Sequence, residues 1–193
     1  MALLSALTSR HQRSPVRHVI NLETLDAVMD TSEHTYDAVI SDLYVRAAKA
    51  LQAGDLETAE SLYRTVISKY PNDPDGHESL GACLSMQGRN DDAEAEYKIA
   101  LSLSPTSEDA AYGLGCIAFD RERYAEAQAY LEKALTANDN SGLSHRLLGI
   151  IHEQMGDRER AIRHYERTIE LASTVGDADK IKVWLARLKN EDK

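Results

Sequence analysis

The chain has 193 residues, a formal net charge of −10, 42% hydrophobic residues and two cysteines. Its length and apolar content suffice for one well-buried domain or a short repeat array, whereas its acidic balance disfavours nucleic acid and anionic membrane surfaces, which attract basic proteins. Two cysteines are too few for a disulfide framework, and no apolar run approaches the roughly 20 residues that span a bilayer. We therefore expect a cytoplasmic protein without a transmembrane anchor.

Residues 1–35 are expected to form an N-terminal arm whose first part is basic, since no acidic residue precedes Glu23. Apolar residues precede Arg10, Arg13 and Arg17, which reverses the order found in a secretory signal. Three interpretations stay open for the arm: a targeting segment, a partly disordered tail or short helix, and an extended ligand for the protein's own binding groove.

A repeated pattern of small and apolar residues dominates the segment 36–175. Gly81, Gly115 and Gly149 are evenly spaced, and a fixed period of about 34 residues indicates a helical repeat array. Three further columns keep the same spacing: Ala59, Ala93, Ala127 and Ala161; Leu80, Leu114 and Leu148; and Tyr63, Tyr97, Leu131 and Tyr165. A single unit cannot bury both faces of its helices, so we expect the units to stack.

Turn and cap residues mark where each repeat changes direction. Gly54, Gly88 and Gly156 recur at one turn, and Glu122 takes the glycine position in the third repeat. Polar residues suited to helix starts precede the helices: Asp55, Asp73, Ser107, Ser141 and Asp157. The pattern predicts units over about 40–73, 74–107, 108–141 and 142–175, with helix pairs near 40–70, 74–103, 108–136 and 142–172.

The pattern resembles the tetratricopeptide repeat family, and the second unit fits best. The family has small or apolar residues where this unit carries His77, Leu80, Gly81, Leu84, Ala93, Tyr97, Ala100 and Pro105. The resemblance implies an all-α fold, a right-handed α-solenoid of four helix-turn-helix units with a C-terminal capping helix and an N-terminal arm. It does not imply a partner, because the family has many binding functions.

Residues 176–193 are expected to form the capping helix and tail. Its apolar residues would cover the open end of the array, as caps of repeat proteins do; they are Ile181, Val183, Trp184, Leu185 and Leu188. Lys180, Lys182, Arg187 and Lys189 would face water. We interpret the single tryptophan as part of this cap and not as a ligand platform.

Few residues suggest catalysis or metal binding. His145 and His152 lie on one predicted helix and His164 follows on the next, but this register places them where helices pack, which favours hydrogen-bonded packing residues over ligands. Cys83 and Cys116 are interpreted as reduced packing residues. We expect no catalytic residues, no metal and no cofactor.

The remaining candidate site is the concave surface of the first helices, which the resemblance implies as a peptide groove. The positions that line it carry Tyr44, Ala48, Gln52, Glu78, Ala82, Met86, Asp109, Tyr112, Cys116, Phe119, Asp120, Arg146, Ile150 and Glu153. These residues favour a protein or peptide partner with apolar anchors and basic charge. The lysine and asparagine clamp that some family members use for acidic tails is absent from these positions.

The predicted function is a non-catalytic scaffold or adaptor that binds a peptide segment in this groove. One alternative is a cytosolic chaperone, because the stretches 43–54 and 80–83 resemble the opening of type III secretion translocator chaperones. Another is a self-assembling structural scaffold, which would be a homo-oligomer. The sequence does not identify the partner.

Overall fold

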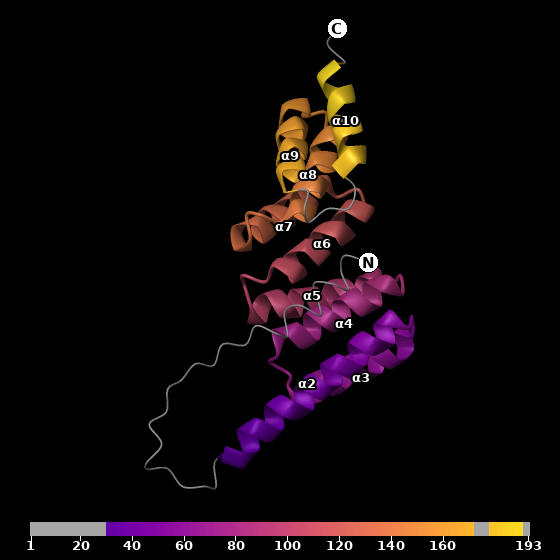
Figure 1. The fold of residues 1–193 in the computed structure, drawn as a ribbon, viewed down its shortest axis with the longest axis vertical. Coiled ribbons are helices and arrows are strands. Elements are labelled where there is room, and N and C mark those ends of the chain that lie inside the picture. Colours follow the sequence, from indigo (N-terminus) through magenta and orange to yellow (C-terminus); the bar gives the residue numbers. More distant parts are fainter. Residues whose placement is uncertain (1–29, 172–177, 191–193) are drawn as a thin grey trace, which may run out of the picture. The chain divides into compact units, whose positions relative to one another are not determined.

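The computed structural model describes residues 30–171 and 178–190. These residues form nine α-helices and no strand, so the expected all-α tetratricopeptide-type fold is confirmed. The helices are α2 (Asp30–Gln52), α3 (Leu56–Lys69), α4 (Pro74–Met86), α5 (Asn90–Leu103), α6 (Glu108–Asp120), α7 (Tyr124–Ala137), α8 (Gly142–Gln154), α9 (Arg158–Glu170) and α10 (Ala178–Asn190) (Figure 1). None of these helices is long and apolar enough to cross a membrane.

The chain divides into two compact units. Unit 1 ends at Arg89 and contains α2, α3 and α4; unit 2 begins at Asn90 and contains α5 to α10.

In unit 1, α3 packs against both α2 and α4. Ala59, Tyr63 and Val66 form the buried stripe of α3, because residues three and four apart share one helix face. The cap prediction is confirmed at two helix starts: Asp55 accepts a hydrogen bond from the backbone N–H of Thr58 at 3.0 Å, and Asp73 accepts one from Asp75 at 3.2 Å.

The start of α2 differs from the prediction. The repeat register places the first helix near residue 40, whereas α2 already begins at Asp30. No glycine or proline stands between Asp30 and Gln52, so nothing in the chain stops the helix where the register begins. The boundary expected at residue 35 therefore falls inside a helix, and the part of the arm before Asp30 lies outside the described residues.

Unit 2 is built from the pairs α6–α7 and α8–α9, with α5 packed on α6 and α10 packed on α9. Figure 1 shows α8, α9 and α10 side by side. Two apolar clusters lie among the described residues of unit 2. One includes Ala127, Leu131 and Leu148, and the other joins Tyr165 of α9 to Ile181 of α10.

The glycine column is explained by close helix contacts. A Cβ atom on Gly149 would lie 2.5 Å from Cε1 of Tyr165, and one on Gly115 would lie 2.8 Å from Cγ of Leu131. Each of these glycines therefore faces the large residue on the second helix of its own repeat. The glycine column and the Tyr/Leu column of the sequence are therefore the two sides of one helix–helix contact. The helices can approach this closely because glycine has no side chain.

In unit 2 two of the three predicted cap residues form the expected hydrogen bond with the backbone at a helix start. Ser107 accepts a hydrogen bond from Ala110 N at 3.1 Å, and Asp157 accepts one from Arg160 N at 3.1 Å. Ser141 precedes α8 but makes no side-chain cap bond. Its hydroxyl lies 3.0 Å from that of Ser144 instead, so the neighbouring hydroxyl takes the place of the backbone N–H.

A polar link between repeats recurs at the same period. Glu60 accepts hydrogen bonds from Gln87 at 2.8 Å and from Arg89 at 2.9 Å in unit 1. Glu94, which holds the equivalent position in the next repeat, accepts one from Arg121 in unit 2. These acidic residues tie the second helix of one repeat to the turn of the next, a feature that the sequence analysis missed.

Candidate functional site

Tyr44, the first predicted groove residue, is buried in unit 1. Its hydroxyl donates a hydrogen bond of 2.6 Å to Asp73, and its ring centroid lies 6.1 Å from that of Tyr63. Burial, followed by the hydrogen bond to Asp73, raises the pKa of Tyr44 far above its usual range. Tyr44 thus links α2 to the residue that caps α4, and this contact uses its polar atom.

The other groove candidates of unit 1 differ in exposure. Glu78 and Ala82 on α4 are buried and Ala48 is half-buried. Gln52 is exposed, and 44% of the surface of Met86 is accessible. Among the six candidates of this unit, only Gln52 and Met86 are exposed.

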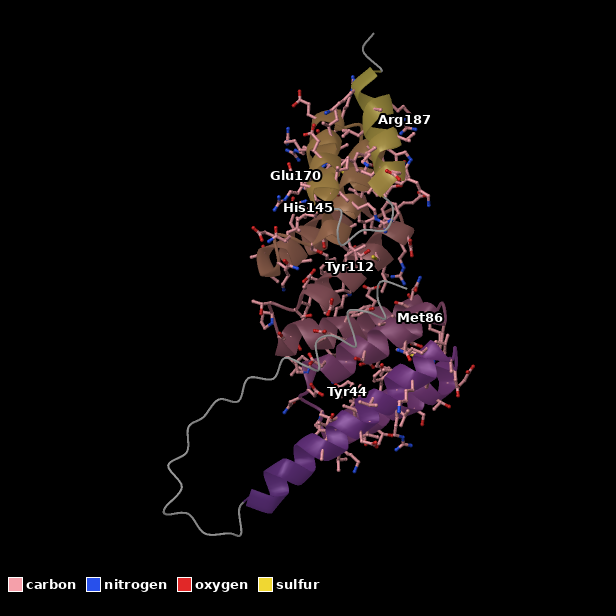
Figure 2. All side chains as sticks on the ribbon, in the orientation of Figure 1. Tyr44, Met86, Tyr112, His145, Glu170 and Arg187 are labelled. Carbon is pink, nitrogen blue, oxygen red and sulfur yellow. The ribbon has the colours of Figure 1, made fainter. Side chains whose placement is uncertain are left out.

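In unit 2 the first helices of neighbouring repeats, α6 and α8, are in contact and bring several predicted residues together. The side chain of Tyr112 lies close enough to those of Cys116, one turn along α6, and Arg146 of α8 for both to influence its pKa. All three are half-buried, and Tyr112 and Cys116 pack on the apolar cluster that includes Leu147. Tyr112 is labelled in Figure 2 on α6.

The thiol of Cys116 and the phenol of Tyr112 stay neutral at neutral pH. Burial raises the pKa of Cys116 to about 11, and the nearby carboxylate of Asp120 also raises it. Burial likewise raises the pKa of Tyr112 above its ordinary value. A thiol that remains protonated is a poor nucleophile, so Cys116 has the character of a small apolar contact residue.

At the end of α6, Phe119 is half-buried with its ring centroid 5.9 Å from that of Tyr124. Asp120 follows it and is exposed, whereas Asp109 at the start of the helix is half-buried. One helix face therefore carries a continuous row of Tyr112, Cys116 and Phe119 next to an exposed carboxylate.

Near the C-terminal end of α8, two predicted groove residues contact α10. Ile150 packs on the cluster that contains Ile181 and Leu188. Glu153 accepts a hydrogen bond of 2.8 Å from the Tyr165 hydroxyl and forms an ion pair with Arg187. The charge of Glu153 is therefore matched within the chain, a pairing that the sequence analysis did not foresee.

The capping helix buries a narrower face than predicted. Ile181 and Leu188 are buried and Trp184 is half-buried, with its ring centroid 5.9 Å from that of Tyr165. The prediction that Val183 helps to cover the end of the array is wrong, because 67% of its surface is exposed. Arg187, labelled in Figure 2, lies on this helix and forms an ion pair with Glu153 of α8.

The three histidines named from the sequence lie together between α8 and α9. Nδ1 of His145 is 3.0 Å from Nδ1 of His164, and the rings of His152 and His164 are stacked 5.4 Å apart. Among the described residues, no group of three or more histidine, cysteine, aspartate or glutamate side chains is arranged to hold a metal ion. Cys83 and Cys116 are both free thiols.

The repeated helix pairs and their inward-facing glycines define a tetratricopeptide-type repeat protein, a class whose stacked helices present extended surfaces to other proteins. The family model for the middle TPR-like domain of cilia and flagella-associated protein 70 matches residues 43–172, which is more than half of the chain. The chain therefore belongs to this family of TPR-like domains. No curated protein matched the chain.

Solved structures share the fold. A crystal structure of MamA is 24% identical and covers 76% of this chain and 94% of its own, with a TM-score of 0.59. A structure of pilF from Pseudomonas aeruginosa is 21% identical, covers 82% and 71%, and has a TM-score of 0.72. TTC0263, a TPR protein of Thermus thermophilus, is 21% identical, covers 77% and 80%, and has a TM-score of 0.63. At these identities the likeness concerns the fold.

Proposed function

We propose that this protein is a non-catalytic, cytoplasmic interaction scaffold that binds a peptide segment along α6 and α8 of unit 2. The row of Tyr112, Cys116 and Phe119 on α6, beside Arg146 on α8, is the observation that carries the proposal. Aromatic and arginine side chains dominate the binding energy of protein interfaces. Each of these four side chains is partly exposed and held by contacts within unit 2, so little order has to be gained on binding.

The charge of this surface suggests the chemistry of the partner. Arg187 already neutralises Glu153, whereas Asp120 is exposed next to Phe119. A basic residue placed beside an apolar anchor would meet both Asp120 and Phe119. We propose a peptide of this kind, bound at about micromolar strength, which corresponds to roughly −8 kcal/mol.

Selection from a displayed random-peptide library tests the proposal, with affinities measured by fluorescence anisotropy. The double variant Tyr112→Ala/Phe119→Ala should bind the selected peptides at least about tenfold more weakly, the usual cost of losing interface anchors. Ile99→Ala is the matched control, because Ile99 is 40% exposed and lies on α5, outside the proposed row of residues on α6 and α8. Far-ultraviolet circular dichroism should show equal helicity in both variants.

Two results would contradict this function. One is a library that yields no binder at micromolar strength. The other is a set of binders that tolerates the double variant but is lost with Ile99→Ala.

The two alternative functions make different predictions. A self-assembling scaffold would sediment faster as its concentration rises, whereas a monomeric adaptor would not. A chaperone of the type III secretion kind would keep an apolar cargo protein soluble, and its action would not depend on a basic residue in the cargo.

A further inference from the structure

Three imidazole rings form a contact between α8 and α9 that the proposed peptide surface does not use. The ring centroids of His145 and His164 are 5.3 Å apart, and their Nδ1 atoms are 3.0 Å apart. The centroid distance is about equal to the nitrogen distance plus the two ring radii, which is the largest value it can take, so the nitrogens face each other head on. This is the geometry of an N–H···N hydrogen bond. The ring of His152 stacks on that of His164, with 12° between the ring planes.

The hydrogen bonds determine which nitrogens carry protons. Nε2 of His145 lies 3.1 Å from the backbone carbonyl oxygen of Asp139, which can only accept, so Nε2 carries the hydrogen. In the neutral ring Nδ1 of His145 is then the acceptor, and Nδ1 of His164 donates to it. Only one proton fits between the two Nδ1 atoms, and a second would replace the hydrogen bond by repulsion.

The third ring adds a second reason for neutrality. His152 is only 2% exposed, and its buried Nδ1 has no hydrogen-bond partner. A proton added there would be a buried donor without an acceptor, which destabilises the folded state.

We propose that the stack of His145, His164 and His152 is an acid-sensitive latch, which holds α8 against α9 at neutral pH and loosens unit 2 in mildly acidic solution. The latch stands on the head-on hydrogen bond, the stacked third ring and the unpartnered nitrogen. α8 also carries Arg146 of the proposed peptide surface, so release of a bound peptide at acidic pH would follow; this consequence alone rests on the proposed function.

The electrostatic surroundings act in the same direction. Burial lowers the pKa of all three rings, and the two neighbouring rings also help to lower that of His164, to about 4. The charged groups that face the stack from the packed elements are Glu132 on α7, Asp139 before α8, Asp157 before α9, and Arg160, Arg163 and Arg167 on α9. The arginines oppose protonation and the carboxylates favour it.

The sign of the pH effect follows from these shifts. A histidine with a lowered pKa binds fewer protons in the folded than in the unfolded chain, so its stabilising contribution is complete above about pH 6.5 and is lost as the pH falls toward 4. A fall in pKa from about 6.5 to about 4 corresponds to a roughly 30-fold lower folding constant at pH 5 than at pH 7.5. His164 is partly exposed, so screening reduces the effect and we expect about tenfold.

The fluorescence of Trp184 can follow the latch in the full-length protein. It is the single tryptophan of the chain, and its ring lies on Tyr165 of α9. We expect urea unfolding at pH 5 to require less denaturant than at pH 7.5, with a folding constant about tenfold lower. In His164→Asn the amide can still donate to His145 but does not titrate, so much of this difference should disappear. His77→Gln in unit 1 removes a histidine outside the stack and should keep the wild-type difference.

An equal pH dependence in the wild type and His164→Asn would overturn the proposal. If His164→Asn does not fold, nitrogen-15 spectra of the wild-type histidines decide the matter. The latch predicts that His145 carries its hydrogen on Nε2 and that His164 is still neutral at pH 6. A His164 ring that is half-protonated at pH 6 or above would refute it.

Discussion

The turn between α6 and α7 contains a strained residue whose replacement should stabilise the protein. Glu122 has a φ of 58°, whereas the glycines at the equivalent turns, Gly54, Gly88 and Gly156, have φ values of 77°, 76° and 75°. The turn thus requires a left-handed backbone in every repeat. In the third repeat a residue with a side chain must adopt it.

The expected gain follows from two opposing effects. A left-handed conformation costs an L-residue about 1–2 kcal/mol. Glycine removes that cost but loses about 0.5–1 kcal/mol more conformational entropy on folding. Glu122→Gly should therefore stabilise unit 2 by about 0.5–1 kcal/mol, which raises Tm by about 2–4 °C for each kcal/mol in a chain of this size.

Urea unfolding followed by circular dichroism measures this difference. Glu122→Gln is the matched control, because it removes the charge and keeps the strain, so its stability should stay near that of the wild type. The reverse change, Gly156→Ala, should destabilise; an added Cβ would meet nothing within 4 Å, so the cost is conformational. If Glu122→Gln stabilises as much as Glu122→Gly, charge and not strain explains the effect.

Two further variants test the packing and the polar links. Gly149→Ala should destabilise by about 1–3 kcal/mol, because its Cβ would lie 2.5 Å from the Tyr165 ring; a melting temperature equal to that of the wild type would show that the helices separate at little cost. Glu94→Gln should cost about 0.5–1 kcal/mol by weakening the bonds to Lys98 and Arg121. The hydrogen bond from Lys98 is the largest cause that lowers the pKa of Glu94. The stabilisation by ionised Glu94 is therefore complete at neutral pH and is lost as the carboxylate becomes protonated below about pH 4.5. Glu94→Gln should lose less stability than the wild type in that pH range, and an equal loss would contradict this.

The repeat period predicted the packing well because it records contacts within a repeat. Gly149 and Tyr165 stand in separate columns of the sequence and meet in the structure. The turn of the third repeat has the same left-handed backbone as the other turns, although it carries Glu122 where they carry glycine. The flanking helices therefore fix the conformation of this turn. A repeat pattern cannot show where a helix begins outside the array, and α2 accordingly starts about ten residues before the register does.

The candidate surface could be predicted only in part. The resemblance selected the face of α6 and α8, and these helices do bring Tyr112, Cys116 and Arg146 together. It did not reveal that Tyr44 donates its hydroxyl hydrogen to Asp73. A position in a repeat specifies the direction of a side chain, whereas its exposure depends on residues that differ from one repeat to the next.

The pairing of Glu153 with Arg187 of the capping helix could not be predicted from the repeat pattern. The segment from Glu170 to Ala178 is longer than the turn from Ala137 to Gly142, so the repeat register does not continue into α10 and assigns its residues to no column. Helical periodicity still applies: Ile181, Trp184, Leu185 and Leu188 recur at spacings of three and four and share one face. Val183 falls outside this spacing, and that alone would have predicted its exposure. The contacts of an element beyond a repeat array are better predicted from its own periodicity than from the register of the array.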